Sequence, residues 1–261
     1  MTWLTRRDLK VLARSGSWRF MRDARPSNQK VAVASLQWRG HAVHYRPGTS
    51  DCPVMYEILL KPGSKAEYAL PDAIQPRVIY DIGGNIGLTS IYFANRFPEA
   101  NIHVFEPVPA NYQLLQNNIA PYPRVRAHQV ALGASDGELD MFGSDNANNF
   151  GGFSFFDKGV DRTKRTTVVQ CHAQRYIDKH CLPQPDLIKI DTEGAEHAIL
   201  SSLDAELLAR VQWIIGELHG ERDFELLAHL SQWFDIGMRK AMNRRLFIFN
   251  AGNRCLKTGS Y

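Results

Sequence analysis

Residues 80–90 read Tyr-Asp-Ile-Gly-Gly-Asn-Ile-Gly-Leu-Thr-Ser, after a short apolar run at 78–80 and at the start of a helical apolar pattern at 86–97. This order predicts a strand, a glycine turn and a helix. A second predicted strand, Ile102-His103-Val104-Phe105, follows and ends at Glu106. In α/β sheets, a glycine turn after one strand and an acid at the end of the next hold an adenosine group, because the acid accepts hydrogen bonds from the ribose hydroxyls.

The chemistry of the turn indicates which adenosine compound it holds. Its pattern is Asp81-x-Gly83-x-Asn85-x-Gly87, which differs from the G-x-G-x-x-G of dinucleotide sites. The turn begins with a carboxylate and has no Lys or Arg, so it would repel a pyrophosphate but accept a cationic sulfonium. We therefore predict S-adenosylmethionine as the cofactor, with Glu106 on the ribose. A nicotinamide-dependent oxidoreductase is the less favoured alternative.

The composition is that of an ordinary globular chain. Of 261 residues, 44% are hydrophobic and 22% charged, and the net charge of +4 permits acidic partners without requiring a nucleic acid. The four cysteines form no C-x-x-C pair, which favours a reducing compartment over a zinc site or a disulfide framework. No apolar run approaches the roughly 20 residues of a membrane span. The first thirty residues lack a secretory apolar core, and we predict a cytoplasmic protein.

The first 25 residues are basic and contain apolar residues at helical spacing, among them Trp3, Leu12 and Phe20. This pattern predicts an amphipathic helix. The simpler interpretation is a helix that packs on the domain and leaves its basic face in solvent. The alternative is a helix that docks on a membrane surface or an acidic partner.

The chain divides near Pro76. Residues 1–75 are predicted to be an N-terminal extension, made of the basic helix and short strands, that caps the site. Residues 76–261 alternate between strands and helices, which predicts an α/β fold with a doubly wound, mostly parallel sheet. The expected strands are 77–81, 101–106, 124–131, 137–142, 166–171, 187–190, 211–217, 234–238 and 245–250, and the main helices are 86–97, 109–119, 195–209 and 221–232.

Ligands of such sheets bind beyond the carboxyl ends of the strands. Asp191 and Glu193 follow the strand at 187–190, and we predict that they orient the acceptor or take its proton; the alternative is a role as acids at a helix N-terminus. His219 follows the strand at 211–217 and is the other candidate base, although a lone histidine is often structural. A divalent ion on Asp191, Glu217 and His219 is a third alternative, but no paired histidine spacing supports it, and we predict no metal site.

Two further features lie near this edge. Lys189, in a central strand, is predicted to reach a carboxylate at the end of the sheet rather than to act in catalysis. Residues 146–154 are rich in Asn, Gly and Phe. They are interpreted either as a lid over the acceptor or as an ordinary surface loop.

Four segments together resemble the FkbM family of S-adenosylmethionine-dependent methyltransferases. They are Tyr80–Ser90, Val104-Phe105-Glu106-Pro107-x-Pro109-x-Asn111, Ala131-Leu132-Gly133 and Ile188-Lys189-Ile190-Asp191-x-Glu193-Gly194-x-Glu196. The segments 46–51 and 67–68 also resemble sequences that precede the core in bacterial members. The resemblance implies a class I methyltransferase fold and cofactor contacts from Pro107, Ala131, Leu132 and Asp191.

The resemblance also implies an acceptor. Members of the family usually methylate a hydroxyl of a sugar, a polyketide or a similar metabolite, and some methylate nitrogen. We therefore expect an O-methyltransferase that acts on a small molecule or glycan and has no specific nucleic-acid partner. The alternatives are an N-methyltransferase of the same fold and a non-catalytic protein docked to a membrane or RNA.

Overall fold

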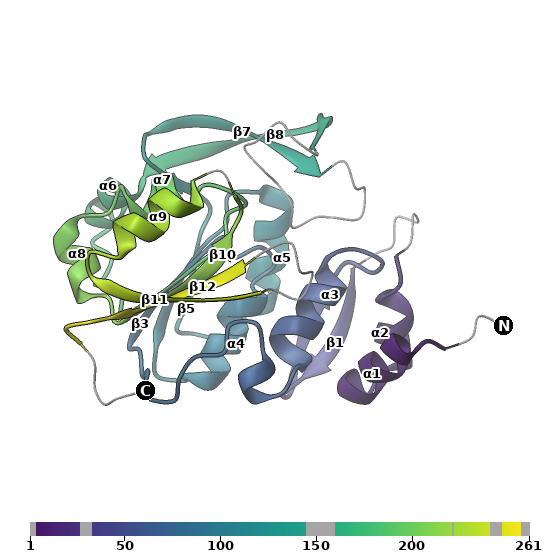
Figure 1. Cartoon of the computed structure of the whole chain (residues 1–261). Coiled ribbons are helices and arrows are strands. Elements are labelled where there is room, and N and C mark those ends of the chain that lie inside the picture. Colours follow the sequence, from purple (N-terminus) through teal and green to yellow (C-terminus); the bar gives the residue numbers. More distant parts are fainter. Residues whose placement is uncertain (1–3, 27–32, 145–159, 221, 241–246, 257–261) are drawn as a thin grey trace.

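The computed structural model describes residues 4–26, 33–144, 160–220, 222–240 and 247–256. Its centre is a seven-stranded sheet in the order β11-β12-β10-β9-β3-β4-β5 (Figure 1). Strand β12 is antiparallel to both of its neighbours, and the pairs from β10 to β5 are parallel. The strands are β3 (Val78–Ile82), β4 (Asn101–Phe105), β5 (Val125–His128), β9 (Leu187–Ile190), β10 (Trp213–Leu218), β11 (Phe234–Lys240) and β12 (Phe247–Asn253).

Helices cover both faces of this sheet, so the predicted doubly wound α/β fold is confirmed. Alternate residues of β3 enter different cores: Ile79 packs with one hydrophobic cluster and Tyr80 with the other. The first cluster includes α4 (Leu88–Arg96) and α5 (Pro109–Ile119). The second includes four short helices, α6 (Ala173–Lys179), α7 (Glu196–Leu200), α8 (Ala205–Arg210) and α9 (Asp223–Leu230). The strand order reverses between β3 and β9, where such sheets bind ligands.

Two predicted elements are divided in the structure. The strand expected at 124–131 ends at His128, and residues Ala131–Gly133 form β6 in a separate sheet with β7 (Gly137–Ser144) and β8 (Val160–His172). The helix expected at 195–209 was also wrong as one element, because α7 ends before Ser201 and α8 begins at Ala205. Serine and aspartate at 201–204 favour turns over helix interiors.

The small N-terminal α/β extension packs against the face that carries α4 and α5. It contains helices α1 (Arg6–Ser15), α2 (Trp18–Asp23) and α3 (Asp51–Met55), and strands β1 (Ala34–Trp38) and β2 (His41–Tyr45). It also contains the short π-helix η1 (Tyr56–Leu60) and the short 3₁₀-helix η2 (Gly63–Lys65). Met55 and Ile58 share a hydrophobic cluster with Leu88. The domain boundary near Pro76 stays a prediction.

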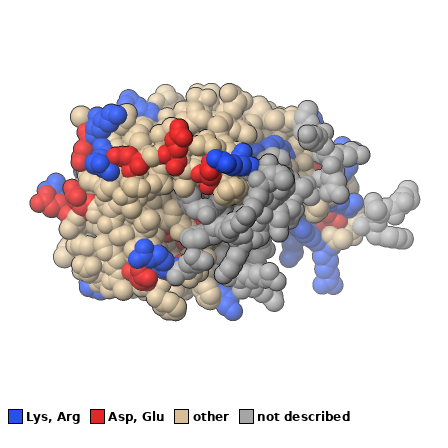
Figure 2. All heavy atoms as spheres, turned by 90° about the horizontal axis from the view of Figure 1, so that it is seen from above, with Lys and Arg blue, Asp and Glu red and all other residues tan. Residues whose placement is uncertain are grey.

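The basic N-terminal segment forms two helices rather than one, because Gly16 adopts a left-handed conformation (φ 63°) between them. Val11, Phe20 and Met21 are buried in the core shared with the rest of the chain, so packing on the domain is confirmed for these residues. Docking on a membrane or partner is untested. On the face in Figure 2, basic and acidic side chains are interspersed over the described surface.

Three further sequence-based expectations concern the cysteines, a membrane span and the loop at 146–154. The four cysteines are all free thiols, as their spacing predicted. No helix within the described ranges has the length and apolar character of a membrane span. The loop at 146–154 lies outside the described residues, and its role as a lid stays a prediction.

Candidate active site

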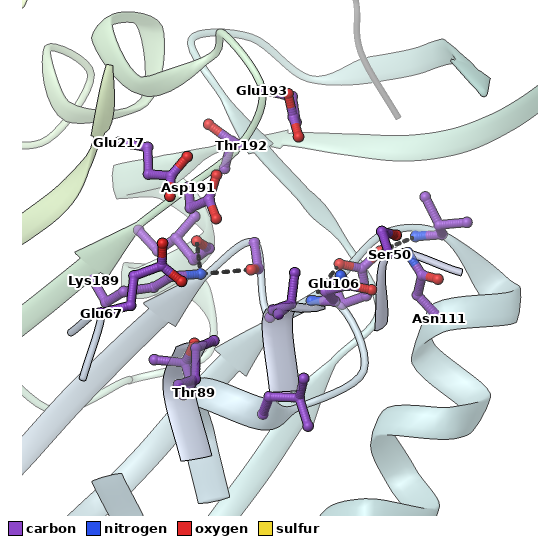
Figure 3. A pocket seen from close by; sticks show the side chains of 18 of the residues that line it. Ser50, Glu67, Thr89, Glu106, Asn111, Lys189, Asp191, Thr192, Glu193 and Glu217 are labelled. Atoms are coloured by element: carbon purple, nitrogen blue, oxygen red, sulfur yellow. Dashed lines mark hydrogen bonds between the residues drawn. The ribbon is translucent and has the colours of Figure 1, made fainter. Parts of the chain in front are cut away.

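A cavity of about 550 Å³ lies at the carboxyl edge of the sheet, in the size range of small-molecule sites. The ends of β3, β4, β9 and β10 line it, and the N-terminal extension contributes further residues. Figure 3 shows Glu106 and Asn111 together in one part of the cavity and Glu67, Asp191 and Glu217 in another. We call the first part the nucleoside side and the second the acidic side.

The glycine turn after β3 is shaped by close packing. A Cβ on Gly83 would lie 1.8 Å from the carbonyl oxygen of Asp191, and one on Gly84 would lie 2.1 Å from a methyl group of Val104. These glycines therefore let the turn sit against the neighbouring strand ends. Gly83 and Asn85 line the cavity, and their predicted contact with the cofactor stays a prediction. Gly87, with φ at 86°, precedes α4 and is not among the lining residues.

Glu106 lies at the end of β4, is 5% exposed and lines the cavity. Its Oε2 accepts a hydrogen bond from the backbone N–H of Asn85 (2.8 Å) and its Oε1 one from that of Val108 (2.9 Å). The side-chain amide of Asn111 donates a longer bond of 3.4 Å. Burial outweighs these donors and raises the pKa of Glu106 to about 7.

The nucleoside side has hydrogen-bond acceptors that remain available for the hydroxyl groups of a ribose. A carboxylate offers about four lone-pair positions, and three donors occupy Glu106. The side-chain oxygen of Asn85 is buried without a hydrogen-bond partner. Glu106 and Asn85 both line the cavity and both carry acceptors that suit hydroxyl donors, so these residues fit the adenosine group of S-adenosylmethionine.

Apolar residues complete this side of the cavity. Pro107, Ala131 and Leu132 all line it, and the cofactor contacts that the family resemblance implies for them stay a prediction. Val108 and Met141 also line it and pack with Ala131 in a small hydrophobic cluster. An adenine ring fits such surroundings, although the strand that carries Ala131 belongs to the second sheet.

Asp81 is completely buried and does not line the cavity, unlike the predicted cofactor contact. Its carboxylate pairs with Lys189 (3.1 Å) and accepts a hydrogen bond from Ser90 (2.7 Å). Lys189 also donates to the carbonyl oxygen of Gly83 (2.7 Å). Its pair with Asp81 confirms the prediction that Lys189 reaches a carboxylate at the end of the sheet. The positive charge of Lys189 balances the negative charge of Asp81. Asp81 would therefore repel a bound pyrophosphate less than the sequence alone indicated.

Four carboxylates surround His219 on the acidic side. We call Asp191, Glu193, Glu196 and Glu217, with His219, the acid cluster. Nε2 of His219 lies 3.7 Å from Asp191, 3.6 Å from Glu193 and 3.7 Å from Glu217, while Nδ1 lies 3.0 Å from Glu196. Asp191, Glu193 and Glu217 line the cavity, whereas His219 and Glu196 are not among its lining residues.

The turn that follows β9 explains how these acids converge. Glu193 (φ 55°) and Gly194 (φ 115°) have left-handed backbones. Buried Glu196 closes the turn by accepting hydrogen bonds from the backbone N–H groups of Thr192 (2.8 Å) and Gly194 (3.3 Å). Glu196 is thus a structural acid at the start of α7, whereas Asp191 faces the cavity.

The crowding of acids shifts their proton affinities. Burial and the carboxylate of Asp191 raise the pKa of Glu217 to about 9 and that of Glu67 to about 7. Burial lowers the pKa of His219, but the hydrogen bond with Glu196 and the nearby carboxylates outweigh it and bring the pKa to about 10. An imidazole already protonated at neutral pH is a poor base, so this arrangement lends no support to the predicted base role of His219.

The extension supplies site residues whose roles the sequence did not indicate. The hydroxyl of Tyr68, which is 2% exposed, donates to Oδ2 of Asp191 (3.1 Å), and Glu67 also lines the cavity. Thr49 and Ser50 approach from the loop before α3. The segments 46–51 and 67–68 were noticed only through the family resemblance, because no local pattern assigns them to a site.

Comparison with known proteins places this geometry in a family. The model of the methyltransferase FkbM domain matches residues 81–249. AMB antimetabolite synthetase AmbE of Pseudomonas aeruginosa is 30% identical over 187 residues, which are 59% of this chain and 9% of AmbE. The 2-O-methyltransferase NoeI of Sinorhizobium fredii is 27% identical over 163 residues, 57% of this chain and 65% of NoeI.

The chain thus spans less than two thirds of either curated relative. A putative O-methyltransferase structure from Klebsiella pneumoniae aligns with 97% of this chain and 92% of its own at 12% identity and a TM-score of 0.44. The family match covers well over half of the chain, and it begins at the turn and reaches the last strand of the sheet. The chain belongs to the FkbM methyltransferase domain family.

Proposed function

We propose that this protein is an S-adenosylmethionine-dependent methyltransferase that methylates a hydroxyl of a small molecule or glycan. The observation that carries the proposal is a cavity in which Glu106 and Asn85 offer acceptors to a ribose and an acidic side adjoins them. Family membership supports the methyl donor, and the name of the relative NoeI supports an oxygen acceptor.

The donor supplies an activated methyl group on a sulfonium. The protein's part is alignment, which contributes about 7–11 kcal/mol in well-oriented reactions. Glu106 and Asn85 hold the ribose, and Ala131 and Leu132 pack against the adenine. This fixes the methyl group with respect to the acidic side.

Asp191 and Glu193 are proposed to act on the acceptor. As the methyl–sulfur bond breaks and the methyl–oxygen bond forms, the hydroxyl proton passes to a carboxylate. Tyr68 fixes Asp191 through its hydrogen bond, and Glu196 fixes His219 behind these acids. The free thiols fit a reducing, cytoplasmic location.

An amine acceptor is the second candidate. The acidic side carries Glu67, Asp191, Glu193 and Glu217, which would attract an ammonium group. An ammonium has no lone pair for the methyl group, however, so an amine acceptor also requires loss of a proton. Because the relative NoeI is named a 2-O-methyltransferase, a hydroxyl acceptor remains the favoured proposal.

Two measurements test the proposal. Calorimetry with S-adenosylmethionine, S-adenosylhomocysteine and NAD should give binding of the first two only. Labelled S-adenosylmethionine should then methylate members of a panel of glycans, hydroxylated metabolites and amino sugars, and mass spectrometry identifies the modified atom. Tight binding of NAD without binding of either adenosyl compound would overturn the proposal.

A further inference from the structure

We propose that helices α1 and α2 form a docking surface for an anionic lipid bilayer. We call this the basic surface. Its exposed side chains are six basic residues, Arg6, Arg7, Lys10, Arg14, Arg19 and Arg22, and three apolar residues, Leu4, Leu9 and Trp18. Binding to lipid is inferred from charge and exposure, and it does not rest on the proposed methyltransferase activity.

The net positive charge of the chain comes from this segment. The whole chain contains 31 Lys and Arg and 27 Asp and Glu, which give a net charge of +4. Residues 4–26 hold seven of the basic and two of the acidic residues, a net charge of +5. The remaining 24 basic and 25 acidic residues have a net charge of −1. An anionic partner would therefore be attracted to this end of the molecule.

The two acids of the segment are occupied by other contacts. Asp8 is buried and pairs with Arg25 at 2.9 Å. Asp23 accepts a hydrogen bond from the hydroxyl of Tyr45 (2.8 Å) and lies 3.7 Å from Arg19. Within the described ranges, no acid forms an ion pair with the other five basic residues of the basic surface. Their charges therefore remain available to an external partner.

The fold also leaves apolar side chains in solvent between the basic ones. Val11 and Phe20 are among the residues on the buried side of the two helices. Leu4, Leu9 and Trp18 are 43%, 52% and 60% exposed. Because packing on the domain leaves much of these three side chains uncovered, they are available to enter another apolar phase.

This mixture of side chains favours a bilayer over a nucleic acid. Basic groups attract anionic lipid headgroups, while leucine and tryptophan enter the boundary between the headgroups and the acyl chains. A nucleic acid offers phosphates, and a base could stack on Trp18. It offers no apolar phase to Leu4 and Leu9, so the exposed leucines decide between the two partners.

The basic surface adjoins the cavity. Arg7 belongs to both, and Ala24 and Pro26 also line the cavity. Figure 1 shows α1 and α2 at one end of the molecule, where a flat partner can approach them. Docking would hold the cavity beside the bilayer, within reach of an acceptor anchored there. This consequence alone rests on the proposed function.

The test is sedimentation of the full chain with vesicles of phosphatidylcholine that contain about one third phosphatidylserine, and with vesicles of phosphatidylcholine alone. We expect binding to the first only, and a strong decrease at high salt because salt screens the attraction. Arg6, Lys10 and Arg14 lie at four-residue spacing along one side of α1. Changing all three to Gln should weaken binding by roughly fivefold per charge, or about a hundredfold together.

A second triple variant controls for the loss of net charge. It changes three exposed arginines outside the N-terminal extension to Gln, namely Arg124, Arg165 and Arg254. It should bind the anionic vesicles within about twofold of wild type, since charges beyond the screening length contribute little. Thermal unfolding of each variant shows whether it is folded. No binding of wild type to anionic vesicles, or equal losses in the two triple variants, would overturn the proposal.

The apolar residues separate lipid from other anions. Leu9→Ser combined with Trp18→Ser should weaken vesicle binding at least several-fold, because both side chains leave water on docking. The same pair should not change the weak, salt-sensitive binding of single-stranded polyuridylate RNA by more than the stacking of one residue. Unchanged vesicle binding by this variant, or RNA binding as tight as vesicle binding by wild type, would identify a general site for polyanions and overturn the bilayer as the partner.

Discussion

Replacing Glu106 by glutamine is predicted to weaken cofactor binding while the fold survives. The side chain keeps its shape but loses its charge, and a hydrogen bond to a charged group contributes about 1.5–3 kcal/mol. Affinity for S-adenosylhomocysteine should therefore fall roughly ten- to a hundredfold. The amide also turns a donor toward the N–H of Asn85 or Val108, which now donate to Glu106 at 2.8 and 2.9 Å. Leaving one of them unsatisfied costs about 1–3 kcal/mol of stability.

The same residue predicts a pH dependence. Burial raises the pKa of Glu106 to about 7, so below this pH the cofactor-free protein holds a proton on the group that must accept from the ribose. The proton competes with the ligand. Affinity should be constant well above pH 7 and should fall as pH drops through 7, approaching about tenfold per unit for a single linked proton. Glu106→Gln should lack this slope.

Calorimetry from pH 5.5 to 8.5, with thermal unfolding at each pH, measures both effects. Glu99→Gln is the matched control, because Glu99 is 86% exposed and pairs with Arg124 at the surface. It should bind like wild type throughout. If Glu106→Gln binds S-adenosylhomocysteine as tightly as wild type, or if both share one pH slope, the ribose is not held by Glu106.

Three further predictions concern the surroundings of the site. Lys189→Met leaves Asp81 buried without its cation and should cost about 3–5 kcal/mol in urea unfolding; a loss under 1 kcal/mol would contradict a tight pair. Phe20→Ala, at a fully buried position, should cost about 3–5 kcal/mol, whereas Leu9→Ala, at 52% exposure, should cost under about 0.5 kcal/mol; equal losses would refute packing of the N-terminal helices. Tyr68→Phe removes the donor to Asp191 and should lower turnover without changing S-adenosylhomocysteine affinity; an unchanged turnover would show that this bond does not orient Asp191.

The nucleoside side was largely predictable because its signals are local. The turn at 83–87 and Glu106 follow consecutive strands, and parallel strands end at one edge of a sheet. The same rule brought Asp191 and His219 to within 3.7 Å of each other. Sequence spacing alone does not predict which of these side chains face the cavity. It also does not predict that Asp81 is buried and pairs with Lys189.

The extension could not be placed by such rules. Tyr68 lies 123 residues before its partner Asp191, and no periodicity connects them. The break before Ala131 was missed for a similar reason. The strand-like pattern at 124–131, in which apolar residues such as Val125, Ala127 and Val130 recur, continues past the point where the chain leaves the main sheet. Only the pairing of β6 with β8 separates the two strands.

The two parts of the cavity differ in how their acids are stabilised. Glu106 is surrounded by N–H donors that the backbone fixes in place, so the nucleoside side is formed before a ligand arrives. On the acidic side, His219 lies 3.6–3.7 Å from the carboxylates of Asp191, Glu193 and Glu217. Protons also stabilise this side, because burial and the carboxylate of Asp191 raise the pKa of Glu217 to about 9. At neutral pH Glu217 then carries a proton that it can donate to an oxygen of the acceptor, so the acidic side would select acceptors by their oxygens.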